Sequence, residues 1–423
     1  MTDAIKQRVW ESCDALWDEE LNYLAELVRR PSVRGETNPV QRYLAESMRA
    51  MDLTVSEEGI DVDQIAGLPG FSPPEWSYDG LVNVVGRAVA METGGRSLVL
   101  NGHIDVVSAE PLDHWTHDPW GAELVDGRMY GRGAADMKSG VAAMIYALQA
   151  IRRSDVRLRG DVIVQTVIDE ECSGNGTLSC LATGHIADGA IIPEPTDLSL
   201  VTAHPGVLWC RVTVRGSGAH ASHAAAAVNA VEKLFLLIGA LRQMEAEWNA
   251  PECRPAVFAS VAHPLNFNIG TVHAGDWPSS VPERADTEIR FSYYPDQDFR
   301  DVQQRIRDRI TDVAAQDPWL RDHPPEVTFF GFIAEPAVYK REDPIARIVA
   351  ANSRAVTGRP ADSFPMTATI DNRFFELYYD IPNACYGPAG DRLHAPDEWV
   401  DLESVRATTK VLAGAILDWC GSA

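Results

Sequence analysis

The fold is decided by the stretch Leu98-Val99-Leu100-Asn101-Gly102-His103-Ile104-Asp105, where an apolar run stops abruptly at polar residues. Such a break indicates a buried strand whose polar side chains emerge at its carboxyl end. The same design recurs where the run 161–168 meets Asp169-Glu170-Glu171, and where 189–192 meets Pro193-Glu194-Pro195. Three strands are therefore predicted to present an imidazole or carboxylates at one edge of a sheet.

Residues 138–151 lie between the first two strands and carry apolar side chains at helical spacing, which predicts a β-α-β unit. Units of this kind build the mostly parallel, doubly wound sheet of the α/β class. Ligands bind to such sheets at the carboxyl edge of the strands, where the polar residues are expected to gather.

The pattern changes from about Gly206. We expect strands at 207–214, 268–272 and 285–293 and helices at 224–247 and 298–315, an order typical of a compact α+β domain. A chain of 423 residues is also longer than one hydrophobic core usually organises. We therefore predict a catalytic domain formed by residues 1–205 and 321–423, with the α+β domain inserted at 206–320.

Composition narrows the possible partners. The chain carries 61 acidic and 37 basic side chains, a net charge of −24, which repels nucleic acid and anionic membranes and favours a small-molecule partner. No apolar run approaches the roughly 20 residues of a membrane span, and the first residues do not resemble a secretory signal. We expect a cytoplasmic protein whose seven scattered cysteines are reduced thiols.

The polar residues at the strand ends suit a metal site. His103 can bind an ion while Asp105, on the same side of an extended segment, orients its imidazole. Asp136 follows the glycine-rich turn 131–133 at the start of a helix, where backbone amides hold a carboxylate in place. Of the pair Glu170-Glu171, one carboxylate can bind a metal and the other can take a proton from water.

Each of these residues also has an ordinary structural interpretation, as a helix cap, a solvated acid or a hydrogen-bonded surface histidine. Together with Glu194 and His394 they supply two imidazoles and three carboxylates. That donor set suits two Zn²⁺, Co²⁺ or Mn²⁺ ions about 3.5–4 Å apart. We predict a site for two divalent metal ions.

Six ordered motifs then reveal a resemblance. G-H-I-D-V-V, Y-G-R-G-A-A-D-M-K-S-G, D-E-E, P-E-P-T, G-A-H-A-S and Y-G-P-A-G with H-A-P-D-E follow one another along the chain. In these motifs the sequence closely resembles the dinuclear-metal family of acetylornithine deacetylase, succinyl-diaminopimelate desuccinylase, aminoacylase and carboxypeptidase G. The resemblance implies that the inserted domain serves as a lid and in dimerisation.

The resemblance also implies a role for each site residue. Asp136 would bridge the two ions, His103 and Glu194 would complete one ion, and Glu171 and His394 the other. Glu170 would be the general base and Asp105 the orienting acid. His220, in the inserted domain, would reach into a neighbouring subunit's site and stabilise oxyanion charge, which implies a homodimer or higher oligomer. The alternative is that His220 is an ordinary loop residue.

Departures from the family pattern concern the substrate. Ser279 stands where the lid usually has an asparagine, Ser292 where many relatives have an arginine that binds a substrate carboxylate, and Ile370 where a threonine is usual. Arg290, two residues before Ser292 and on the same strand face, is a candidate for that arginine. The predicted substrate-binding residues are Asn268, Arg290 and Gly387.

The predicted function is hydrolysis of a C–N bond by a metal-bridging hydroxide. The favoured substrate is an N-acyl amino acid or a related amide that bears a carboxylate. One alternative is hydrolytic deamination of an aromatic amino acid of the anthranilate type, and the other is an inactive binding protein with the same fold.

Overall fold

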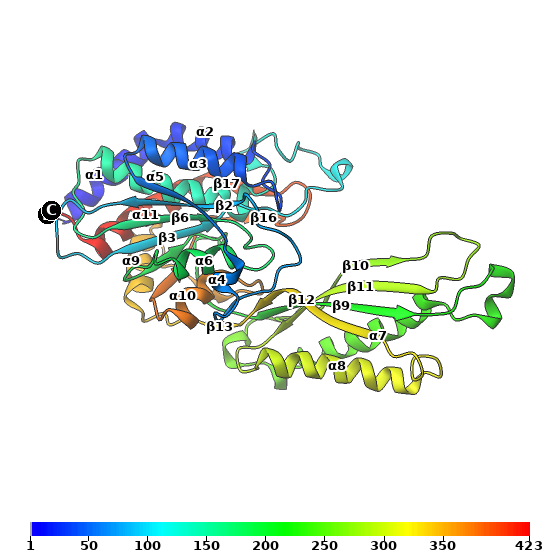
Figure 1. Ribbon diagram of the computed structural model, residues 1–423. Coiled ribbons are helices and arrows are strands. Elements are labelled where there is room, and N and C mark those ends of the chain that lie inside the picture. Colours follow the sequence, from blue (N-terminus) through cyan, green and yellow to red (C-terminus); the bar gives the residue numbers. More distant parts are fainter. Residues whose placement is uncertain (1) are drawn as a thin grey trace.

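A six-stranded sheet lies at the centre of the first domain in the computed structural model, which describes residues 2–423 (Figure 1). Its strand order is β1 (Thr54–Gly59), β2 (Val82–Ala88), β6 (Val162–Val167), β3 (Leu98–His103), β7 (Ala190–Ile192) and β15 (Asn383–Cys385). Strands β6, β3, β7 and β15 run parallel, whereas β1 and β2 pair antiparallel. The predicted mostly parallel α/β sheet is confirmed.

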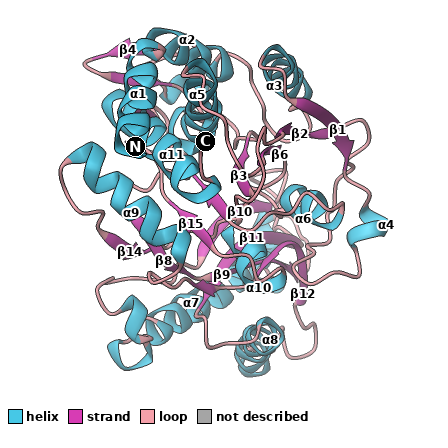
Figure 2. Ribbon diagram, turned by 90° about the vertical axis from the view of Figure 1, so that its left-hand side faces the viewer, coloured by secondary structure: helices cyan, strands magenta, loops and turns pink. Residues whose placement is uncertain are grey.

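Helix α5 (Ser139–Arg153) connects β3 to β6, as the spacing of its apolar residues predicted. Every residue of β3 and β6 is buried, because helices cover both faces of the sheet. Figures 1 and 2 show α1, α2, α3 and α5 on one face and α6 and α10 on the other. The bounds of the remaining helices of this domain are α1 (Thr2–Ala15), α2 (Trp17–Val28), α3 (Asn38–Ala50), α4 (Val62–Ile65), α6 (Asn175–Ala182), α9 (Pro344–Thr357), α10 (Asn372–Tyr378) and α11 (Leu402–Cys420).

Two small sheets extend the first domain. One has the order β13 (Ala337–Val338), β8 (Leu200–His204) and β14 (Ser363–Pro365), and the other has the order β16 (Gly390–Asp391), β17 (Trp399–Asp401), β5 (Arg128–Tyr130) and β4 (Glu123–Val125). The second of them brings the segment before Asp136 next to the segment that contains His394.

The second domain is an antiparallel sheet with two helices on one face (Figure 1). Its strand order is β10 (Asn268–Ala274), β11 (Arg284–Tyr293), β9 (Gly206–Arg215) and β12 (Glu326–Ala334). Helices α7 (Ala230–Trp248) and α8 (Phe299–Gln316) bury apolar side chains against β9 and β11 in a core separate from that of the first domain. The predicted α+β order is thus present.

Two predicted boundaries differ from the structure. Residues from 321 were assigned to the first domain, but β12 pairs with β9 and belongs to the second. The apolar pattern of β12 does not reveal which sheet it joins, so only the pairing identifies its domain. The helix predicted from 224 begins instead at Ala230, because Asn229 caps it and residues 221–226 form a separate 3₁₀ turn.

All seven cysteines are free thiols, and only Cys253 is exposed. Along residues 2–423, no helix has both the length and the apolar character that a membrane span requires.

Candidate metal centre and active site

Three strand ends build one wall of the site. β3 lies between β6 and β7 and runs parallel to both, so their carboxyl ends meet at one edge of the sheet. His103 ends β3, Glu170 and Glu171 follow β6, and Glu194 follows β7. The breaks from apolar to polar residues in the sequence thus mark a single place in the fold.

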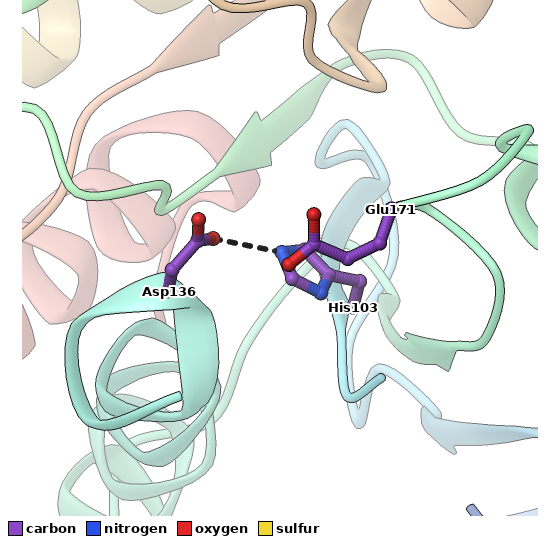
Figure 3. A group of neighbouring side chains, drawn as sticks. All are labelled: His103, Asp136 and Glu171. Carbon is purple, nitrogen blue, oxygen red and sulfur yellow. Dashed lines mark hydrogen bonds and ion pairs between the residues drawn. The ribbon is translucent and has the colours of Figure 1, made fainter. Parts of the chain in front are cut away.

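Asp136 lies between the two predicted imidazoles. Its Oδ1 atom is 3.0 Å from Nε2 of His103, and its Oδ2 atom is 3.6 Å from Nε2 of His394. The residue precedes α5 in a non-helical conformation, which directs its carboxylate toward the end of β3 (Figure 3). Two oxygens of one carboxylate that face two different imidazoles are the arrangement a bridging ligand requires.

The remaining carboxylates divide between the same two sides. Oε2 of Glu194 is 3.8 Å from Nε2 of His103, and Oε2 of Glu171 is 3.0 Å from Nε2 of His394. Ligand atoms of His103, Asp136 and Glu171 also lie within 4.8 Å of one another, so the two halves adjoin (Figure 3). One half is enclosed, since His103 is 2% exposed, whereas the His394 side chain is 52% exposed.

The centre gathers five carboxyl groups around its two imidazoles. Within residues 2–423, its five carboxylates, those of Asp105, Asp136, Glu170, Glu171 and Glu194, form no ion pair with a lysine or arginine. Burial raises the pKa of Glu194 to about 8 and that of Asp105 to about 7. The charge of Glu171 raises the pKa of His394 to about 11. Along the described part of the chain, the groups that pair with these carboxylates are the imidazoles of His103 and His394, which are themselves metal donors, so this donor set fits bound divalent cations.

Asp105, predicted to orient His103 through its carboxylate, lies closest to that imidazole through its backbone. Nδ1 of His103 lies 2.9 Å from the backbone carbonyl oxygen of Asp105 and 3.8 Å from its carboxylate. The carboxylate instead accepts hydrogen bonds from the backbone N–H groups of Glu170 and Glu171. The strand ends at His103, so the alternation assumed for Asp105 does not continue. The carbonyl orients the imidazole, and Nε2 is left free for a metal.

Glu170 is buried beside the centre and lines its cavity. Burial, followed by the charge of Asp371, raises the pKa of Glu170 well above its usual range. Asp371 itself accepts hydrogen bonds from Thr177 Oγ1 at 2.6 Å and from Arg373 Nη1 at 3.2 Å. A carboxylate whose pKa is raised in this way is suited to accept and return a proton near neutral pH.

A cavity of about 640 Å³ opens onto the metal centre between the two domains. Asp136, Glu171, Glu194 and His394 lie in its wall together with Glu170. The wall also contains two arginines and several large apolar side chains, among them Arg34, Trp209, Arg290, Phe332, Met366 and Leu393. The site can therefore enclose a small molecule with an apolar part and an anionic group.

Arg290, predicted to bind a substrate carboxylate, lies in the wall of this cavity. It pairs across the sheet with Trp209 on one side and with Asn268 on the other, so the three share a face. Its Nη1 atom donates to Oγ of Ser292 at 2.8 Å, and burial lowers the pKa of Arg290 to about 10. Asn268 lies beside Arg290 but is exposed and outside the cavity wall.

Two predicted residues lie elsewhere. Gly387 is packed behind Glu194, and a Cβ atom on it would lie 2.2 Å from the carbonyl oxygen of Glu194 and 2.6 Å from that of Pro193. Its contact is with the backbone of a predicted metal ligand, not with the cavity. His220 is exposed and forms a β-bridge with Ser280. The loop from β9 to α7 that carries it is at the end of the second domain remote from the first (Figure 1), so one chain does not bring His220 to its own site.

Comparison with known proteins identifies the family. Residues 99–418 match the sequence model of peptidase family M20/M25/M40. The chain belongs to this family. Membership confirms the resemblance found in the motifs, together with the prediction of a hydrolase.

The chain shares less than a third of its residues with each of the relatives described next. The chain is 28% identical over 376 residues to N-formyl-4-amino-5-aminomethyl-2-methylpyrimidine deformylase of Bacillus subtilis (strain 168), covering 83% of this chain and 86% of the relative. The fold of the present chain matches that of the di-peptidase Dug1p of Saccharomyces cerevisiae, with a TM-score of 0.80 at 15% identity, covering 99% of both chains. It also matches human carnosine dipeptidase 1 with a TM-score of 0.77 at 18% identity, covering 98% of this chain and 99% of that one. These structures show a shared fold, and a Bacillus subtilis neighbour is described as a dinuclear metal binding peptidase.

Sequence reasoning missed several residues around the centre of this family member. Arg34 lines the cavity, and Arg373 donates a hydrogen bond to Asp371, whose charge acts on Glu170. Glu398 accepts hydrogen bonds from the loop that carries Asp136. Glu398 stands in the H-A-P-D-E motif, and Asp371 directly follows Ile370, one of the departures from the family pattern. Neither residue could be assigned a role, because no spacing along the chain shows which distant residue it contacts.

Proposed function

We propose that the chain is a two-metal amidohydrolase that removes an acyl group from a small carboxylate-bearing amide. The observation that carries this proposal is Asp136, whose two oxygens face His103 and His394 on opposite sides. His103 and Glu194 would hold one ion, and Glu171 and His394 the other. Bound Zn²⁺, Co²⁺ or Mn²⁺ would supply Lewis-acid chemistry that polarises the substrate carbonyl and stabilises charge developing on its oxygen.

Glu170 would carry the proton in this reaction. It lines the cavity and belongs to the segment that also provides Glu171. Its raised pKa suits a group that takes a proton from the attacking water and returns it to the leaving nitrogen. The backbone bonds from Glu170 and Glu171 to Asp105 would keep base and ligand at a fixed separation.

The cavity supports an N-acyl amino acid as the substrate. Arg290 would bind the free carboxylate, and Ser292 would hold its guanidinium in place. Trp209 and Phe332 would pack against the apolar part of the substrate. The second domain would then select the substrate while the first performs the chemistry.

A second candidate is removal of a formyl group from an amine that carries an aromatic ring. It is supported by the similarity to the pyrimidine deformylase and by the aromatic side chains of Trp209 and Phe332 in the cavity wall. Screening the metal-loaded protein against N-acyl amino acids, N-formyl amines that carry an aromatic ring, and aminobenzoates distinguishes this candidate from the first. Released ammonia from an aminobenzoate would point instead to aromatic deamination.

We propose that the active oligomeric state of the protein is a homodimer. His220 does not line the cavity of its own chain, so a catalytic role for it requires a second subunit. The second domain also exposes apolar side chains at Phe235 and Leu236 on α7 and at Val272 on the edge strand β10. A buried interface would cover such side chains and pair the free edge of the sheet.

The variant Glu170→Gln tests the function directly. It should keep both ions but lose the proton carrier, which should lower kcat by about 10²–10⁴-fold. Steady-state kinetics on the best substrate of the screen, together with metal analysis of the same sample, provide the measurement. Near-normal turnover with two ions present would remove Glu170 from the mechanism.

A further inference from the structure

The buried carboxylate of Glu398 is enclosed by the loop that carries Asp136. Its Oε1 atom accepts hydrogen bonds from the backbone N–H groups of Ala135 at 3.0 Å and Asp136 at 3.1 Å. Its Oε2 atom accepts from the N–H of Gly133 at 3.0 Å and from Nη1 of Arg132 at 2.6 Å. The side chain is 1% exposed. Both oxygens are fully used by these donors, so Glu398 is not itself free to bind a metal.

Glu398 is fixed in turn by the small sheet of the first domain. It directly precedes β17, which pairs with β5 and with β16. Its carbonyl oxygen accepts the N–H of Gly131 at 2.9 Å. His394 lies between β16 and β17, so a single short segment contains both Glu398 and the exposed histidine of the centre.

Arg132 completes the arrangement. Besides its bond to Glu398, its Nη2 atom donates to the carbonyl oxygen of Ser108 at 3.4 Å. Its guanidinium also lies 5.1 Å from the centroid of the Trp115 ring. The buried negative charge of Glu398 therefore has a cationic partner, unlike the carboxylates of the metal centre.

We propose that Glu398 is a positioning residue for the metal centre, and this role rests on the two-metal site proposed above. Glu398 accepts hydrogen bonds from four donors of the Asp136 loop, and it belongs to the segment that bears His394. It therefore connects Asp136, the proposed bridging ligand, to His394, a proposed ligand of the second ion. Groups that orient metal ligands typically contribute about 10–100-fold to metal affinity. Loss of Glu398 should therefore weaken the binding of both ions, since Asp136 would be a ligand of both.

The variant Glu398→Gln is a sharp test because it keeps the shape of the side chain. Whichever way the new amide turns, its NH₂ group faces two donors instead of accepting from them, so two hydrogen bonds are lost. Glu20→Gln is the matched control. Glu20 is also 1% exposed and hydrogen-bonded, but its partner is Thr409 between α2 and α11.

The readouts are Zn²⁺ affinity by competition with a chelating indicator and the visible absorption spectrum of the Co²⁺ form. Glu398→Gln should bind Zn²⁺ about 10–100-fold more weakly and show an altered Co²⁺ spectrum, while Glu20→Gln matches the wild type in both. Wild-type affinity and spectrum in Glu398→Gln would overturn the proposal.

Two further results keep the test decisive. If Glu398→Gln does not fold, Arg132→Met keeps the three backbone bonds and should still lower Zn²⁺ affinity, and unchanged affinity in that variant would overturn the proposal. A wild-type protein that takes up neither Zn²⁺ nor Co²⁺ would instead overturn the metal centre, and the role of Glu398 with it.

Discussion

Asp136 is the side chain on which both halves of the proposed metal centre would depend. Replacing it with alanine should abolish binding at both sites together, because each ion loses a ligand and the link to the other. Metal analysis after dialysis, compared with Asp126→Ala, checks this. Asp126 lies in the turn between β4 and β5, outside the cavity wall. Two tightly bound ions in Asp136→Ala would show that the bridging ligand is a different residue.

Gly387 lies outside the cavity wall but packs against the backbone of Glu194, a predicted metal ligand. A methyl group on Gly387 would meet the carbonyl oxygens of Pro193 and Glu194 and push Glu194 out of place. Gly387→Ala should therefore cost about 1–3 kcal/mol of stability and also weaken metal binding.

The control for that variant is Gly67→Ala, where an added methyl group meets open space. It should leave stability unchanged or raise it by up to about 1 kcal/mol. Thermal unfolding and Zn²⁺ titration of both variants provide the comparison. Equal stability and equal Zn²⁺ affinity of the two variants would mean that the backbone near Glu194 can shift to accept the methyl group without loss of stability.

At the scale of whole elements, the contact between α2 and α11 contains an acid that should make stability depend on pH. Burial raises the pKa of Glu20 from its ordinary value near 4.5 to about 8, and Thr409 hydrogen-bonds to it. Between these two values the folded chain holds a proton that the unfolded chain has released. The contribution of Glu20 to the free energy of unfolding therefore falls as pH rises from about 4.5 to 8, by about 1.4 kcal/mol per unit.

Glu20→Gln should remove this dependence and make the protein more stable than the wild type at pH 9. Denaturant unfolding at pH 5 and pH 9 measures it. A wild type and variant that lose stability in parallel between those values would show that Glu20 is ionised in the folded protein.

For the whole molecule, the question is whether one chain is a complete enzyme. A His220→Ala subunit keeps its metal ligands, and a Glu170→Gln subunit keeps its histidine, so each homodimer should be nearly inactive. A heterodimer of the two contains one complete site, in which intact Glu170 receives His220 from its neighbour. It should recover roughly half of wild-type turnover. Inactive heterodimers of verified mass, or an active His220→Ala homodimer, would make His220 a structural residue.

The sequence by itself determined the mostly parallel sheet of the first domain and the family to which the chain belongs. Each apolar run breaks into His103, Glu170-Glu171 or Glu194 where a strand ends, and parallel strands with helical crossovers must bring those ends to one edge. Asp136 is predicted from the glycine-rich turn before it, and the role of His394 from its place in a motif shared with a known family. Periodicity and motifs are local properties, and a sequence displays them directly.

Only the tertiary structure decided what depends on contacts between distant segments. It assigned β12 to the second domain through its pairing with β9, and it placed Gly387 behind Glu194. It also brought Glu398 under a loop whose residues are more than 260 positions earlier. Hydrogen bonds and close packing are set by three-dimensional proximity, which no spacing along the chain encodes.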